Sequence, residues 1–165
     1  MRKIQRVSRF FRWLFQMACI ALPILSVVFW INLPSSIELI HQAFTVNDIP
    51  NSIKILHTLS SNEKLVGFLI SLMPMLVNLF ILYCLIQLFR LYENYEIFTL
   101  KNVQYIQYIG YTLLIGQLII NPIYEALLSV ALTWHNPQGE RMAVISFTGT
   151  NVGIVLIAFI IILIS

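Results

Sequence analysis

One carboxylate, Glu125, interrupts an otherwise apolar stretch and is the most pointed candidate for chemistry in this sequence. A carboxylate inside a membrane-spanning segment is costly and by default indicates a functional site. Pro122 lacks an N–H and frees a carbonyl one turn earlier, so Asn121, Glu125 and that carbonyl could form a polar notch for a proton or cation. Alternatively, Glu125 lies near the outer interface, nine positions before Trp134. Its shallow depth favours this second interpretation.

Two amide side chains, Asn78 and Gln117, lie near the middle of the second and third apolar stretches. A hydrogen bond between them across a helix interface would satisfy both amides without water. Because each is single and neutral, we interpret them as structural rather than ligand-binding. The candidate intramembrane polar site therefore consists of Asn78, Gln117, Asn121 and Glu125.

Gly149 and Gly153 have the spacing of the small-xxx-small pattern, which lets two helices approach closely. The pattern fits dimerisation and packing within one chain equally well.

The three histidines match no compact metal motif, and the sequence has no Gly-rich phosphate loop or nucleophile elbow. We therefore expect no enzymatic activity, no catalytic residue, no metal and no cofactor.

A second group of polar residues lies in the segment 88–101, between two long apolar stretches. Its ionisable side chains are Arg90, Glu93, Glu96 and Lys101, two basic and two acidic. We interpret them as a candidate surface for a protein partner. The alternative is a turn whose charges are simply solvated.

The elements that must position these residues are membrane helices. Of the 165 residues, 59% are hydrophobic and 10% charged, whereas soluble domains have roughly 45–50% and 25%. A bilayer span needs about 20 apolar residues, and four stretches qualify, at about 11–33, 63–92, 100–133 and 143–165. The sequence predicts an all-α integral membrane protein, with residues 1–165 forming a single four-helix transmembrane bundle.

The fourth predicted helix has two alternative starting positions. If it begins near Met142 it is long enough to span the membrane. If it begins near Thr150, about 15 residues give a length of ~22 Å, which is too short. Under the second interpretation we expect a chain truncated at its C-terminus.

The basic residues predict the orientation of the helices. Five precede the first span, and Arg90 and Lys101 lie on the same side, against Lys54, Lys64 and Arg141 on the other. Seven against three predicts cytoplasmic N- and C-termini. A cleaved signal peptide is the alternative, but its apolar region would be only about 7–15 residues long.

Capping patterns predict how the helices begin. Ser60 with Glu63, three residues later, predicts the start of the second span, and Thr99 that of the third. In the outer loop, residues 34–62, the pair Ser35 and Glu38 opens one short amphipathic pattern. Another starts near Asn51, so we expect two short helices on the outer membrane surface.

The internal signature of the polar segment resembles a bacterial membrane-protein family catalogued as domain of unknown function 2975. The resemblance covers most of the chain and rests on Leu88-Phe89-Arg90-Leu91-Tyr92, Glu96-Ile97-Phe98-Thr99, Asn102-Val103 and Ile109-Gly110. The chain departs from the family at Asn94-Tyr95, where members often carry glycine, and in lacking a short charged tail. The resemblance implies a four-span topology and, by association with a helix-turn-helix regulator, a membrane component of a regulatory pair.

Together these observations predict a non-enzymatic protein that acts through protein or lipid contacts. The expected partners are membrane lipids, a cytoplasmic regulatory protein and a second copy of the chain. Direct binding of nucleic acid is not expected. The alternative function is a small transporter or a proton- or ion-responsive sensor that uses Asn121 and Glu125.

Overall fold

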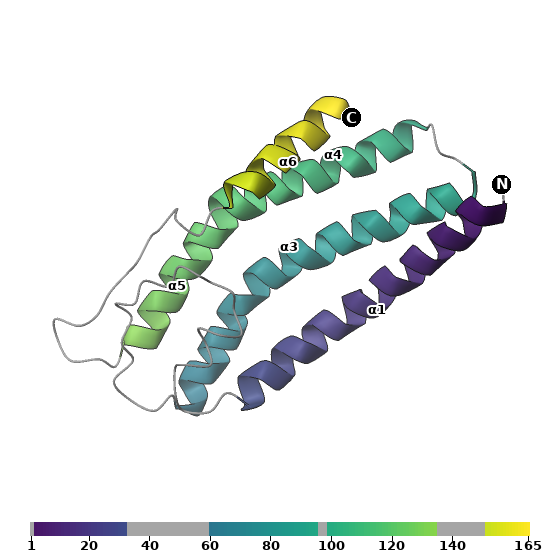
Figure 1. The fold of residues 1–165 in the computed structure, drawn as a ribbon. Coiled ribbons are helices and arrows are strands. Elements are labelled where there is room, and N and C mark those ends of the chain that lie inside the picture. Colours follow the sequence, from purple (N-terminus) through teal and green to yellow (C-terminus); the bar gives the residue numbers. More distant parts are fainter. Residues whose placement is uncertain (1, 33–59, 96–98, 135–150) are drawn as a thin grey trace.

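The computed structural model describes residues 2–32, 60–95, 99–134 and 151–165, which contain helices and no strands. The first helix, α1, spans Arg2–Asn32, and α3 spans Ser61–Glu93. The third stretch consists of α4 (Leu100–Ile115), a π-helical turn η1 (Gly116–Ile120) and α5 (Asn121–Thr133). The last helix, α6, spans Val152–Ile164 (Figure 1).

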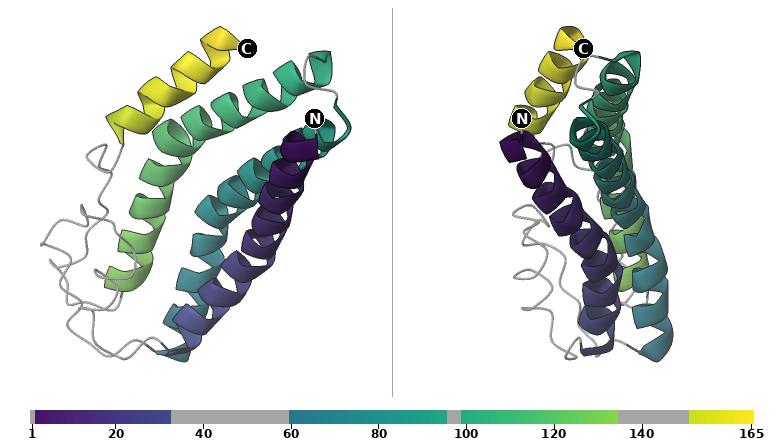
Figure 2. Two further views of the ribbon diagram at one scale, coloured as in Figure 1. Left: turned by 45° about the vertical axis from the view of Figure 1, so that its right-hand side comes forward. Right: turned by 90° about the vertical axis from the view of Figure 1, so that its right-hand side faces the viewer.

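The helices lie side by side in the order α1, α3, α4 with α5, and α6 (Figure 1). Helix α1 packs mainly against α3, and α6 packs mainly against α4. The right-hand view of Figure 2 shows α6 and the beginning of α1 on the same side of α3 and α4. The described helices form a curved, open row. The predicted all-α character is confirmed for the described residues, whereas the four-helix transmembrane bundle stays a prediction.

Three of these helical stretches are long and apolar enough to cross a membrane, namely Gln5–Ile31, Ser61–Glu93 and Leu100–Thr133. The fourth, α6, has 13 residues, or about 20 Å, against a hydrocarbon core of about 30 Å. Large apolar side chains are exposed along one face of α3, at Leu65, Leu69, Leu76, Phe80 and Tyr83. Such a continuous apolar face matches lipid rather than water.

The predicted capping box at the start of the second span is confirmed. The backbone N–H of Ser60 donates to Glu63 Oε2 over 2.7 Å, and Glu63 N–H donates to Ser60 Oγ over 3.4 Å. Thr99 stands at the N-cap of α4, but its side chain makes no capping hydrogen bond. The expected amphipathic helices of the outer loop and the region 143–150 lie outside the described residues.

The turn after α3 contains an unusual backbone conformation. Tyr95 has a φ of 63°, in the left-handed region that glycine adopts at least cost. Its N–H donates to the carbonyl of Tyr92 over 3.2 Å and so helps to close the end of the helix. At Asn94-Tyr95, where members of the resembled family often carry glycine, this chain therefore has a side chain on a residue whose backbone conformation favours glycine.

A close contact fixes the end of α1 to the beginning of α3. Trp30 is buried, and its indole N–H donates to Ser71 Oγ over 3.1 Å. The ring lies over Gly67, where an added Cβ would be 2.2 Å from the nearest ring carbon. Only glycine leaves room for the indole, so the contact fixes the register of α1 against α3.

Candidate functional site

The charged side chains that the structure brings together lie where α1 begins and α3 ends. Arg9 Nε is 2.9 Å from Glu93 Oε1, and Arg12 Nη1 is 2.8 Å from Glu93 Oε2. Gln5 Nε2 donates to the backbone carbonyl of Glu93 over 3.2 Å. The Glu93 side chain is only 14% exposed. We call Gln5, Arg9, Arg12 and Glu93 the arginine clamp.

The arginine clamp follows from local helix geometry. Arg9 and Arg12 are three residues apart, which places them on neighbouring parts of one helix surface. Glu93 ends α3, where the helix dipole disfavours an acidic side chain and the last carbonyls lack partners. Two arginines and one amide from α1 therefore compensate both the carboxylate and a terminal carbonyl.

Aromatic packing continues this contact toward the middle of the helices. The ring centroid of Phe89 lies 5.3 Å from that of Phe11 and 5.6 Å from that of Phe15. Both distances are in the range of favourable aromatic pairs. Helix α1 is thus held to α3 at both ends, by the arginine clamp with Phe89 and by the contact of Trp30 with Gly67 and Ser71.

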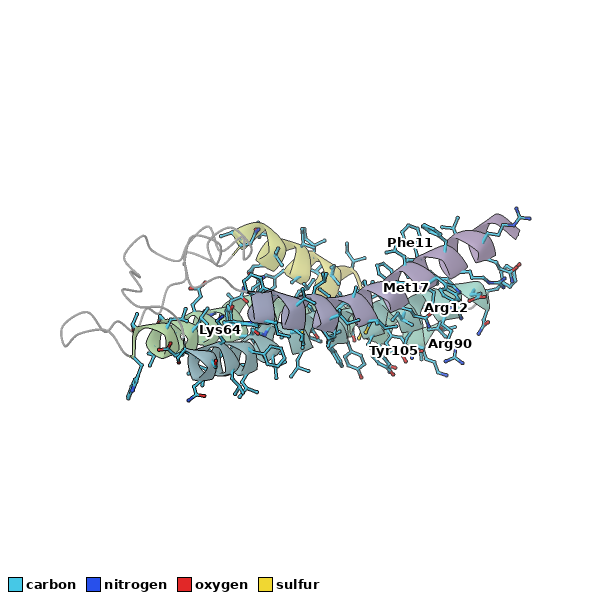
Figure 3. All side chains as sticks on the ribbon, turned by 90° about the horizontal axis from the view of Figure 1, so that it is seen from below. Phe11, Arg12, Met17, Lys64, Arg90 and Tyr105 are labelled. Atoms are coloured by element: carbon cyan, nitrogen blue, oxygen red, sulfur yellow. The ribbon has the colours of Figure 1, made fainter. Side chains whose placement is uncertain are left out.

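The four residues of the predicted partner surface do not lie in one common environment. Glu93 is engaged by α1, whereas Arg90 and Lys101 are exposed, and Glu96 lies outside the described residues. Figure 3 shows Arg12 and Arg90 toward one end of the molecule and Lys64 toward the other. Sequence reasoning missed the roles of Gln5, Arg9 and Arg12.

The predicted intramembrane polar site is also only partly assembled. Gln117 Oε1 accepts a hydrogen bond from Asn121 Nδ2 and another from the backbone N–H of Asn151, each over 3.3 Å. Asn151, which the sequence analysis did not select, also caps α6 by accepting from the N–H of Ile154 over 3.3 Å. The three residues form an amide cluster beside η1.

The position of the amide cluster explains the short fourth helix. Gln117 lies within η1, about halfway along the third helical stretch, and Asn151 immediately precedes α6. Helix α6 therefore begins at the middle depth of the row and runs back along α4 (Figure 1). A helix that begins there cannot cross the full thickness with 13 residues.

Asn78 does not join the amide cluster, and its predicted hydrogen bond with Gln117 is not formed. Asn78 is exposed on α3. At this level Val77 faces Gly116, where an added Cβ would be 2.9 Å from the valine side chain. Asn78 is turned about 100° from Val77 and so lies off this interface. Glu125 lies on α5, where it is partly buried.

Helix α6 approaches α4 closely at Gly110 and Ala158, and not at Gly153 from the predicted pair. At Gly110, an added Cβ would be 2.6 Å from Ile162 and 3.3 Å from the Ala158 carbonyl, and Ala158 is fully buried. Gly153 is exposed, and an added Cβ there would meet only the side chain of Asn151. Gly149 and all three histidines lie outside the described residues.

The fold and its polar clusters define a helical protein. In the part of the chain that the structure describes, three helices are long and apolar enough to span a membrane. The chain belongs to the family described as "Protein of unknown function (DUF2975)", whose profile matches residues 14–165. This finding confirms the resemblance noted in the sequence. Searches of curated proteins and of solved structures found no significant match.

Proposed function

We propose that this chain is a non-enzymatic, multi-pass protein of the bacterial inner membrane that binds a cytoplasmic regulatory protein. The binding surface lies at the end of the molecule where α1 begins, which we call the basic end. Among the described side chains, this end carries Arg6, Arg9, Arg12, Arg90 and Lys101 against Glu93. By the positive-inside rule, such an excess of basic residues supports a cytoplasmic location.

The observation that carries the proposal is the neutralisation of Glu93 by α1. Because Arg9 and Arg12 both lie within 3 Å of the Glu93 carboxylate, this acidic group is withdrawn from the surface. Arg90 and Lys101 stay exposed on either side of the turn between α3 and α4. The described exposed charges of this surface, Arg90 and Lys101, are therefore basic, and the partner should present acidic side chains.

Reversing both exposed charges, with Arg90→Glu and Lys101→Glu together, is expected to reduce capture of the partner about tenfold or more. Like charges facing each other across an interface cost several kcal/mol, and about 1.4 kcal/mol corresponds to tenfold in affinity. The measurement is quantitative mass spectrometry of proteins that co-purify in mild detergent. Lys64→Glu is the control, because it reverses a charge at the opposite end. Equal capture by the double variant and the unaltered chain would contradict the proposal.

A second candidate function, a small transporter or proton- or ion-responsive sensor, is supported by the amide cluster. Helices that are interrupted or begin within the membrane occur where transporters bind ions, because their backbone groups are satisfied there by a cavity or by protein. Here a π-helical turn, Pro122 and the beginning of α6 meet the amides of Gln117 and Asn121.

On this second function, Asn121→Leu and Glu125→Gln should each abolish proton flux into proteoliposomes, measured with an entrapped pH-sensitive dye. The first change removes an amide from the cluster, and the second removes the one titratable carboxylate in this stretch. Asn78→Leu is the matched control, since Asn78 lies outside the cluster. Unaltered flux in both variants would remove the support for a transporter.

A further inference from the structure

The outward surface of α1 near its beginning combines cationic and large apolar side chains. Arg6 and Arg9 are three residues apart and both exposed, so they lie on one face of the helix. Phe10 and Trp13 flank them and are 63% and 55% exposed. Neither ring is covered by another described helix, and both are therefore available to the surroundings of the molecule.

Arg9 is held in a fixed position while part of its guanidinium stays accessible. Its Nε lies 2.9 Å from Glu93 Oε1, and its side chain is 64% exposed. Guanidinium presents five N–H donors in a planar fork, and contact through Nε leaves the terminal nitrogens able to bind a second anion. The arginine clamp thus orients a donor group outward beside Arg6.

The depth of these arginines can be estimated along α1. Arg9 and Trp30 are 21 residues apart in one continuous helix, or about 31 Å. This length matches the hydrocarbon thickness of about 30 Å. Trp30 lies beside Gly67 and Ser71, close to the capped beginning of α3. With Trp30 at one boundary of the hydrocarbon, Arg9 lies at the headgroup level of the other.

We propose that Arg6 and Arg9 bind the phosphate of an anionic phospholipid, with Phe10 and Trp13 beside its glycerol and upper acyl chains. Arginine suits this role because it binds phosphate through two parallel hydrogen bonds. Exposed aromatic rings at the same depth favour a lipid over an acidic peptide, because aromatic side chains concentrate at the membrane interface. The inference is independent of regulator binding at Arg90 and Lys101.

The experiment is native mass spectrometry of the full chain after extraction from membranes of phosphatidylcholine with and without phosphatidylglycerol. Retained phosphatidylglycerol should fall about fivefold for Arg6→Gln, because a basic residue near an anionic surface contributes about 1 kcal/mol. Arg9→Lys should cause a similar loss although it keeps the charge, since one ammonium cannot face both Glu93 and a phosphate. Lys101→Gln is the matched control and should retain the lipid.

Two outcomes would overturn the proposal. One is a loss of phosphatidylglycerol from Lys101→Gln as large as that from Arg6→Gln, which would show only a general effect of net charge. The other is an unchanged amount of retained phosphatidylglycerol in Arg6→Gln and Arg9→Lys. This outcome contradicts the proposal also if the two variants lose a bound acidic protein. If the double variant Arg90→Glu with Lys101→Glu loses a regulator but keeps its lipid, the lipid site is supported. This result would also show that lipid binding and regulator binding use different residues.

Discussion

Substituting alanine for Gly67 is expected to lower the free energy of unfolding by about 1–3 kcal/mol, the usual range for overpacking. The new Cβ would lie 2.2 Å from a ring carbon of Trp30, so the buried indole must move. Its displacement also threatens the hydrogen bond to Ser71. Bonds of this kind between membrane helices contribute about 0.6 kcal/mol on average and at most about 1.7 kcal/mol.

Gly153→Ala is a matched control for this prediction and should change the free energy of unfolding by less than Gly67→Ala does. Gly153 is exposed in the first turn of α6, and an added Cβ there would lie 3.0 Å from Asn151 Oδ1, a side-chain atom, and not against another helix. Unfolding in mixed micelles, followed by circular dichroism, gives both values. Trp30→Leu removes the clashing ring atoms, so the cost of Gly67→Ala should shrink in that background. Equal stabilities of the two alanine variants would contradict the packing of Trp30 against Gly67.

Glu93→Gln is expected to destabilise the packing of α1 on α3 by about 1–3 kcal/mol, the cost of leaving a buried polar group without its partner. The side chain of Arg12 is only 27% exposed, so removing the carboxylate leaves a partly buried cation without its partner. Arg9 is more exposed, and solvent screens its contribution. Most of the effect should therefore come from Arg12.

A double-mutant cycle with Arg12→Gln separates this pair from general effects of charge. If the contact is direct, the double variant should cost less than the sum of the two single variants. Lys101→Gln is the control, because it removes an exposed charge at the same end. An additive cycle, or a Glu93→Gln variant as stable as Lys101→Gln, would show that the arginine clamp does not hold α1 in place.

The helices could be predicted from sequence because their signals are local. Apolar stretches of sufficient length and the spacing of Ser60 and Glu63 were enough to predict the second span and its capping box. The open row was not predictable in this way. It depends on where α6 meets the third stretch, and this contact joins Gln117 to Asn151, 34 positions later.

The candidate site was only partly predictable for the same reason. Glu93 was selected as a charged residue, but its partner Arg9 is 84 positions away in the sequence. Which residues of α1 reach Glu93 depends on the register of α1 against α3. That register depends on the space that Gly67 leaves for Trp30. Similarly, the predicted hydrogen bond between Asn78 and Gln117 was wrong because Val77, and not Asn78, faces Gly116. Which side of a helix faces its neighbour depends on helix rotation, and composition does not determine it.

If the basic end binds a cytoplasmic protein, site-specific photo-crosslinking in living cells should capture that protein. Leu100 is 82% exposed beside Lys101, and a photoreactive residue there samples the proposed surface. Leu69 is 52% exposed on the apolar face of α3 and provides the control position. We expect a crosslinked cytoplasmic protein at position 100 and none at position 69. Crosslinks from position 100 to lipid alone, or only to other copies of the chain, would contradict it.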